Sequence, residues 1–320
     1  MILRKMPKNT RLKTGYAKKT TAGHVIELLE MSSKPKQPPI KKLSADYYMN
    51  TNTGEVFSFD RSKTRADNTD SLRKTFKLIR DTVNANCTDV KRLHWVTLTY
   101  AENMTDTETL YKDFKAFWKR FKRHCSAMGR TAPEYITVVE PQARGAWHCH
   151  CLFIWQDGDR PYIPNKKFRE IWSHGFVRIT SVDKVDNIGA YLSAYLGDVP
   201  LNDYEDKDNP FTPVKEVKGK KYVKGGRLHL YPPGMKLMRA SRGIKRPSQE
   251  VVAPETVDNE KIAAGSCTFR SVVELTDEQT GKTRQLAHSY YNTSRKVCQA
   301  QALLQRALCM GIKCTACDAP

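Results

Sequence analysis

The sequence predicts an α+β fold in which helices pack against an antiparallel β-sheet. Three observations support this class. Some segments alternate apolar and polar residues, as half-buried strands do, and others place apolar residues three and four positions apart, as amphipathic helices do. The two kinds follow one another in the order strand, helix, hairpin, helix, strand, helix, which favours a single antiparallel sheet with flanking helices.

The first half of the pattern contains two helices and one strand. A helix is predicted from Asp70, with apolar residues at Leu72, Phe76, Ile79 and Val83. A strand follows over 94–100, where β-branched and aromatic residues alternate. Residues 105–108 (Thr-Asp-Thr-Glu) predict a capping box for the next helix, whose apolar stripe is Leu110, Phe114, Phe117, Trp118 and Phe121.

The second half of the pattern contains a hairpin, two helices and a further strand. Strands are predicted over 135–140 and 147–155, joined by a turn that contains Gly145. A short helix over 165–173 is expected to end before Gly175, and a strand over 176–182 follows it. The last helix of the pattern is predicted over 184–196, ending at Gly197.

The two ends of the chain are expected to lie outside this domain. Residues 1–45 are rich in Lys and Arg and predict a flexible basic arm. The central domain is expected over 46–247. Residues 248–320 predict a small C-terminal appendage of unknown role, with a strand near 267–275 and a helix near 294–308.

The charge of the chain favours a polyanionic partner. The sequence has 54 Lys and Arg against 34 Asp and Glu, a formal net charge of +20. Nucleic acid is the leading candidate, because neutralised phosphates release counterions, although excess Lys can also simply keep a protein soluble. The candidate DNA contacts are Arg144, Arg239, Arg242, Lys245 and Arg246, and the alternative for this basic stretch is a solvated loop.

Other features indicate a soluble protein of the cytoplasm. The N-terminus lacks the apolar stretch of a signal peptide, and no apolar run is long enough to span a membrane. The nine cysteines are an odd number without the spacing of a disulfide-rich scaffold, which favours reduced thiols. Cys314 and Cys317 form a single C-x-x-C pair, whereas a zinc knuckle needs a second pair.

His148, His150 and Glu140 form the candidate metal site. On a strand His148 and His150 point to one face, while Cys149 and Cys151 point to the other. A three-residue hairpin loop with Gly145 in the left-handed position places Glu140 directly across from His148. Two imidazoles and one carboxylate can hold a divalent cation with open positions, whereas the alternative is structural histidines. A histidine-triad hydrolase would need a third His where Leu152 stands.

Tyr191 and Tyr195 are the candidate nucleophiles. Their spacing of four residues places them on one face of the last predicted helix, although the same spacing is typical of core residues. Phenol has a pKa near 10, but a divalent cation that polarises the phosphorus lowers the demand on it. Attack on DNA would leave a 5′-phosphotyrosine and a free 3′-hydroxyl, a step that can be reversed.

These motifs resemble those of the HUH endonucleases, specifically rolling-circle replication initiators. The resemblance rests on a threonine-containing strand (96–99), Glu140 before His148-Cys149-His150, and Tyr191 to Tyr195, and it covers about residues 90–200, or reaches 247 with the basic stretch. It implies a five-stranded sheet of ferredoxin-like type, a Mg²⁺ or Mn²⁺ ion, and single-stranded origin DNA as substrate. It also implies a bacterial cell that carries a plasmid, phage or integrated element.

The sequence departs from the family pattern at one position. Two-tyrosine relatives usually carry Lys three residues after the second tyrosine, whereas this chain has Asp198. The basic helper is therefore open, with Lys184 and Lys207 as candidates, and so is the attacking residue, because Tyr195 holds the place that resembles single-tyrosine relatives.

Three functions follow as expectations. The first is a replication initiator that nicks and rejoins origin DNA; since the sequence has no P-loop, unwinding would fall to a host or element-encoded helicase. The second is a transposase or conjugative relaxase with the same chemistry. The third is a DNA-binding regulator that carries a structural zinc and does not cleave.

Overall fold

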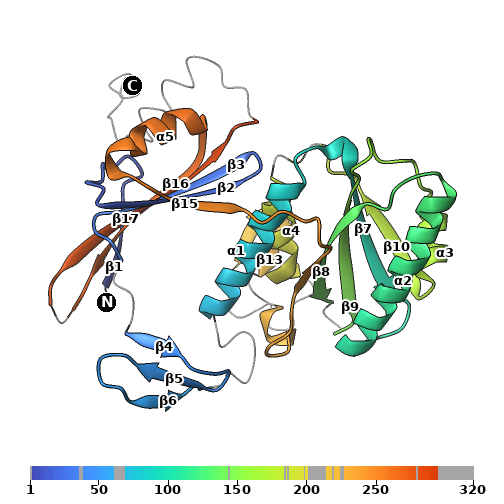
Figure 1. Cartoon of the computed structure of the whole chain (residues 1–320), viewed down its shortest axis with the longest axis horizontal. Coiled ribbons are helices and arrows are strands. Elements are labelled where there is room, and N and C mark those ends of the chain that lie inside the picture. Colours follow the sequence, from blue (N-terminus) through green and yellow to red (C-terminus); the bar gives the residue numbers. More distant parts are fainter. Residues whose placement is uncertain are drawn as a thin grey trace. The chain divides into compact units, whose positions relative to one another are not determined.

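The computed structural model divides the chain into two compact units, shown in Figure 1. The first unit combines residues 1–61 with 247–320, and the second spans 62–246. The structure describes residues 2–35, 39–60, 69–142, 145–183, 185, 187–197, 199–200, 214–217, 220–223, 227–278 and 280–294.

The second unit is built on a five-stranded antiparallel sheet. Its order is β10 (Gly175–Thr180), β7 (Leu93–Tyr100), β9 (Trp147–Ile154), β8 (Glu134–Pro141) and β14 (Met238–Ala240). The predicted α+β class, with helices and antiparallel strands, is confirmed. The edge strand β14 comes from the basic stretch, for which no strand was predicted.

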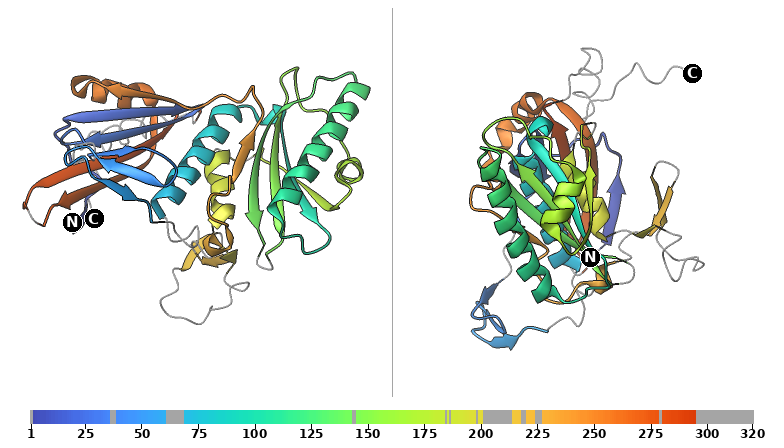
Figure 2. Two further views of the ribbon diagram at one scale, coloured as in Figure 1. Left: turned by 60° about the horizontal axis from the view of Figure 1, so that its bottom comes forward. Right: turned by 90° about the vertical axis from the view of Figure 1, so that its right-hand side faces the viewer.

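Helices cover both faces of this sheet (Figures 1 and 2). On one face, α2 (Thr107–Ala127) and α3 (Asn165–Trp172) enclose Phe153 of β9, whose ring centroid lies 4.9 Å from that of Phe121 and 6.3 Å from that of Phe168. On the other, α1 (Thr69–Asn86) packs against α4 (Ile188–Gly197), which meets the sheet at Trp95. The segment from 93 to 197 thus forms a three-layer sandwich.

Local capping explains where the observed helices depart from the predicted ones. The N-cap of α2 is Asp106, not Thr105, because its carboxylate accepts the backbone N–H groups of Glu108 and Thr109. Helix α3 ends at Trp172 because Ser173 adopts a left-handed conformation (φ 64°). Helix α4 begins at Ile188, four residues later than predicted, because Asn187 caps it.

The first unit contradicts the expected flexible arm. Strands from both ends of the chain form one six-stranded antiparallel sheet: β1 (Ile2–Met6), β16 (Ser266–Thr276), β17 (Thr283–Asn292), β3 (Val25–Met31), β2 (Tyr16–Ala22) and β15 (Ser248–Val252). Because β1 and β3 flank β16 and β17, neither terminal segment completes this sheet alone. The predicted strand near 267–275 is confirmed, whereas the predicted helix near 294–308 and the Cys314–Cys317 pair lie outside the described residues.

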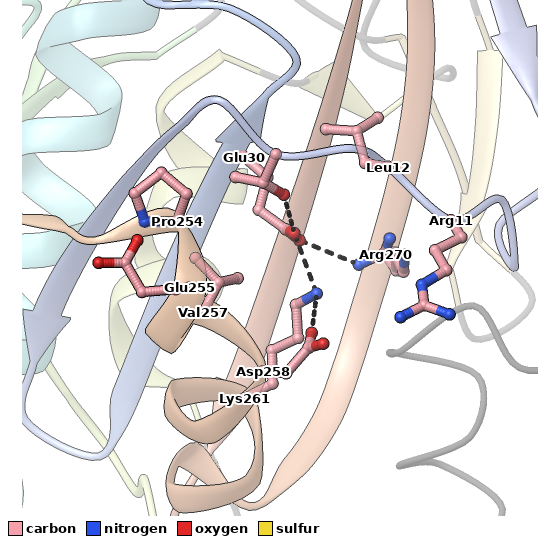
Figure 3. A pocket seen from close by; sticks show the side chains of 10 residues that line it. Arg11, Leu12, Glu30, Pro254, Glu255, Val257, Asp258, Lys261 and Arg270 are labelled. Atoms are coloured by element: carbon pink, nitrogen blue, oxygen red, sulfur yellow. Dashed lines mark hydrogen bonds and ion pairs between the residues drawn. The ribbon is translucent and has the colours of Figure 1, made fainter.

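A buried ion-pair network joins the helix of this unit to its sheet. Lys261 of α5 (Val257–Ala264) lies 2.9 Å from Glu30 of β3, which also pairs with Arg270 of β16 at 3.3 Å. Figure 3 shows these side chains at the wall of a cavity of about 340 Å³ that Arg11 and Asp258 also line. Because every one of the three buried charges has a partner of opposite sign, we interpret the network as structural.

The remaining elements are short. One small antiparallel sheet contains β4 (Ile40–Lys42), β5 (Tyr47–Asn50) and β6 (Val56–Ser58), and another contains β11 (Val199–Pro200), β13 (Lys220–Val223) and β12 (Val214–Val217). Single 3₁₀ turns are η1 (Val90–Arg92), η3 (Leu228–Leu230) and η4 (Pro254–Thr256). Among the described residues, no helix has the length and apolar character needed to cross a membrane.

Candidate active site

The hairpin of β8 and β9 places the three candidate metal ligands on one face of the sheet. Glu140 lies directly opposite His148, in the register that the sequence predicts, and Gly145 of the turn has a positive φ of 86°. His150 lies two residues along the same strand, so its side chain shares the face of His148. This face is the one that α1 and α4 cover.

The opposite face of β9 carries the two cysteines. Cys149 and Cys151 are buried in the core on the side of α2, with their sulfur atoms 3.7 Å apart. Burial raises the pKa of the Cys151 thiol well above its usual range, which keeps the thiol protonated. These cysteines are therefore core residues, as their alternation with the histidines predicts.

Glu140 is a buried carboxylate with two partners. Its relative exposure is 4 %, and its Oε2 lies 2.6 Å from Nε2 of His150. The guanidinium of Arg227 forms an ion pair with its other oxygen. An ionised carboxylate this deeply buried needs such compensation, because the desolvation of an unpaired charge is very unfavourable.

His150 is held by donors and acceptors on both sides of its ring. The indole N–H of Trp95 donates to Nδ1 at 3.4 Å, and the hydroxyl of Thr97 lies 3.1 Å from the same nitrogen. Because an indole N–H can only donate, Nδ1 accepts, and Nε2 carries the proton that bonds to Glu140. Burial lowers the pKa of His150 to about 4, so the ring is neutral at neutral pH, which is the form that binds metals.

His148 completes the donor set without yet enclosing a cation position. Its ring centroid lies 6.5 Å from that of His150, with the planes at 83°. Two neutral imidazoles and a carboxylate on one face fit the donor chemistry of a divalent cation. Within the described part of the chain, however, no three His, Cys, Asp or Glu side chains surround a common point, and Glu140 is engaged by Arg227 and His150 instead.

Of the two candidate nucleophiles, the side chain of Tyr191 is described. It is 38 % exposed, and its ring packs edge-on against Trp95 with 5.5 Å between the centroids. Because Trp95 also donates to His150, a single side chain links Tyr191 to the candidate metal ligands. Tyr195 lies one turn later on α4, and its side chain is outside what the structure describes.

A contact with α1, which the sequence did not reveal, positions the tyrosine helix. Asn84 of α1 donates from its amide nitrogen to Asn187 at 2.9 Å and accepts the backbone N–H of Gly189 at 2.8 Å. A Cβ on Gly189 would lie 2.2 Å from the carbonyl oxygen of Arg80, so only glycine allows this close approach of the two helices. Helix α4 is thus fixed at the turn that precedes Tyr191.

Arg227 and Tyr231 are site residues that the sequence analysis missed. Tyr231 is buried, and its hydroxyl donates to the carbonyl of Leu196 on α4 at 2.8 Å and lies 3.4 Å from that of Val139 on β8. These bonds tie the segment that carries Arg227 to the tyrosine helix and to the strand of Glu140. Neither residue belongs to a recognisable motif, so only the fold reveals them.

The basic residues proposed as DNA contacts lie away from this site. Arg239 packs over the ring of Tyr111 at 3.4 Å, and Tyr111 belongs to α2 on the opposite face of the sheet. The backbone N–H of Lys245 donates to Asn86, and that of Gly243 donates to Glu134 at the other end of β8 from Glu140, roughly 20 Å away at 3.3 Å per residue. Two further members of the set, Arg242 and Arg246, are exposed in the same segment.

Four further residues from the sequence analysis fall outside the described part of the chain. They are Arg144, Lys184, Asp198 and Lys207. Where the basic helper of the family pattern was sought, the structure shows Arg227 in direct contact with Glu140.

One comparison with known proteins gives a match to this segment. Residues 93–199, about a third of the chain, match the family model of the ORF2-type replication-associated proteins. The matched segment runs from β7 to the start of β11 and contains Glu140, both histidines and both tyrosines. No curated protein and no solved structure matches the chain. The similarity supports a role in DNA replication.

Proposed function

We propose that this chain is a replication initiator of HUH endonuclease type that nicks single-stranded origin DNA and later rejoins the ends. The observation that carries the proposal is the placement of Glu140, His148 and His150 on one sheet face beside the helix of Tyr191, within the segment similar to replication-associated proteins. The five-stranded antiparallel sheet with helices on both faces supports the ferredoxin-like assignment.

The metal-binding role falls to Glu140, His148 and His150. A Mg²⁺ or Mn²⁺ ion at these residues would polarise the scissile phosphate. The chain's own contribution is to keep His150 neutral by burial and to orient its ring through Thr97 and Trp95. Such outer partners fix ring orientation and typically affect metal affinity and activity strongly.

The nucleophile is the phenol of Tyr191 or Tyr195. Its oxygen forms a bond to the phosphorus and loses its proton, while the bond from the phosphorus to the 3′-oxygen breaks and that oxygen takes up a proton. The products are a 5′-phosphotyrosine and a 3′-hydroxyl that can prime rolling-circle synthesis. Because no phosphoester bond is lost overall, the released 3′-hydroxyl can attack the phosphotyrosine and rejoin the strand.

The open side of the same sheet face offers a contact for the DNA strand. Phe176 and Arg178 of the edge strand β10 stand opposite Thr99 and Thr97, so they share the face of the histidines. Phe176 is 59 % exposed, and Arg178 is exposed as well. An exposed aromatic ring beside a cation is the combination that binds single-stranded DNA by stacking and charge.

A covalent-adduct assay tests the proposal. The full chain is incubated with Mn²⁺ and labelled single-stranded oligonucleotides that tile the DNA flanking its gene, and the products are separated on a denaturing gel. The proposal predicts a protein–DNA adduct that Glu140→Gln and the double variant Tyr191→Phe/Tyr195→Phe abolish. DNA binding without any adduct, under any divalent ion, would favour the regulator, whereas adducts with transposon-end or transfer-origin DNA alone would favour the transposase or relaxase.

A further inference from the structure

Arg227 supplies the positive charge that the buried Glu140 requires. The two side chains have relative exposures of 14 % and 5 %, so their charges interact with little screening by solvent. A divalent cation bound to Glu140 would supply the same compensation. The guanidinium and the cation are therefore alternative partners of one carboxylate.

The fold anchors the segment of Arg227 rather than leaving it on a free loop. Arg227 precedes η3, and Tyr231, directly after that turn, is anchored to Leu196 and Val139. Val139 is the neighbour of Glu140 on β8, so the anchor and the ion pair lie at adjacent positions of the strand. The same tyrosine bonds to the helix of the candidate nucleophiles.

The hydrogen bonding of Arg227 is incomplete. Its buried Nε has no hydrogen-bond partner among the described residues. A buried donor without a partner carries the cost of its desolvation, which offsets part of what the ion pair contributes. An incompletely bonded guanidinium is a partner that a metal ion with three ligands can displace.

We propose that Arg227 is a positioning residue that competes with the divalent cation for Glu140. It keeps the carboxylate against His150 while no metal is bound, and it gives the carboxylate up when the cation takes Glu140, His148 and His150 as ligands. This inference rests on the proposed function, because it requires that these three residues bind a divalent cation.

Mn²⁺ binding by the metal-free full chain tests the inference without any DNA. Free Mn²⁺ is followed by electron paramagnetic resonance during titration of the wild type, Arg227→Gln, Arg227→Lys and Arg123→Gln. The last is the matched control, because Arg123 is an exposed residue of α2 on the other face of the sheet. Tryptophan fluorescence checks that each variant is folded.

The expected result is tighter Mn²⁺ binding when the competitor is removed. Arg227→Gln should lower the dissociation constant about tenfold, equivalent to about 1.4 kcal/mol of lost competition. Arg227→Lys keeps the charge and the folded state but loses the forked geometry, so its affinity should lie between those of the wild type and the Gln variant. Arg123→Gln should match the wild type.

Two different failures are distinguishable. If the wild type binds Mn²⁺ and Glu140→Gln removes this binding, but both Arg227 variants bind as the wild type does or more weakly, the competition is overturned and the proposed function stands. If Arg227→Gln does not fold, an Arg227→Lys affinity equal to that of the wild type overturns it alone. If the wild type binds no Mn²⁺ that depends on Glu140, both the proposed metal site and the inference are overturned.

Discussion

Single residues decide how closely the tyrosine helix approaches its neighbours. In the middle of a helix, alanine normally stabilises relative to glycine by about 1 kcal/mol. At Gly189 the new methyl group would lie 2.2 Å from the carbonyl oxygen of Arg80, which is backbone and has little freedom to move. Overpacking of this kind costs about 1–3 kcal/mol, so the steric term outweighs the helix propensity.

We therefore expect Gly189→Ala to lower the free energy of unfolding by about 1–2 kcal/mol and to slow adduct formation. Urea denaturation followed by tryptophan fluorescence measures the first effect. Ala190→Ser is the matched control, because Ala190 is exposed on the next position of the same helix. A Gly189→Ala protein at least as stable as the wild type would show that α1 and α4 do not pack as described.

At the same scale, the sequence carried the positions of the candidate ligands and not their partners. The register of Glu140 and His148 was predictable because the turn length and Gly145 fix how two adjacent strands pair. Arg227 is 87 residues from Glu140 along the chain, and no local rule relates such distant positions. Asn84 was missed for the same reason, since its bond to Gly189 joins two helices.

Among the elements, the edge strand β10 is the part of the sheet most open to a DNA strand. Stacking of a base on an aromatic side chain contributes about 1–3 kcal/mol. Phe176→Ala should therefore weaken the binding of a single-stranded oligonucleotide roughly 5- to 150-fold, as measured by fluorescence anisotropy at fixed salt. Tyr162→Ala is the control, because Tyr162 is 89 % exposed and lies outside the strands of the sheet. Equal losses in both variants would argue against a specific role for β10.

In the other unit, the element α5 depends on a buried charge network. Glu30→Gln would leave Lys261 and Arg270 without their shared carboxylate, and breaking a buried pair typically costs about 3–5 kcal/mol. All five tryptophans lie between Trp95 and Trp172, so fluorescence does not report on this unit. Hydrogen exchange in β3, β16 and β17 is the suitable measurement, and the variant should exchange faster there. Unchanged protection would mean that the network contributes little.

Across the whole molecule, the elements of one unit follow from local pattern and those of the other do not. The strands and helices from 93 to 197 were predicted within a few residues, because their apolar periodicity and turns are local signals. The sheet of the first unit pairs residues 2–6 with 272–276, a contact between opposite ends of the chain. The basic composition of residues 1–45 therefore suggested an arm, while the pairing that orders them is non-local.

Buried neutral histidines give the second unit a defined pH dependence. Burial chiefly, with a smaller contribution from Arg160, lowers the pKa of His94 to about 4, and Trp155 donates to its Nδ1 at 3.0 Å. An unfolded histidine has a pKa of about 6.5, so below that pH the unfolded chain takes up a proton that the folded chain does not. The folded state therefore loses stability as the pH falls from about 6.5 to about 4.

The free energy of unfolding should fall by up to about 1.4 kcal/mol per pH unit for each such histidine. Urea denaturation followed by tryptophan fluorescence between pH 6.5 and 5 measures this slope. His94→Gln should make the slope shallower, while His24→Gln, in the other unit, should leave it unchanged. A His94→Gln slope equal to that of the wild type would show that His94 does not stay neutral in the folded protein.

The most direct test of the central claim is to identify the residue that carries the DNA. After the reaction with Mn²⁺ and single-stranded DNA, the protein is treated with nuclease and protease, and the peptides are sequenced by mass spectrometry. The account predicts a nucleotide phosphate on Tyr191 or Tyr195 of α4, and none in Glu140→Gln protein. A nucleotide on any residue outside α4, or an equal yield without Glu140, would contradict it.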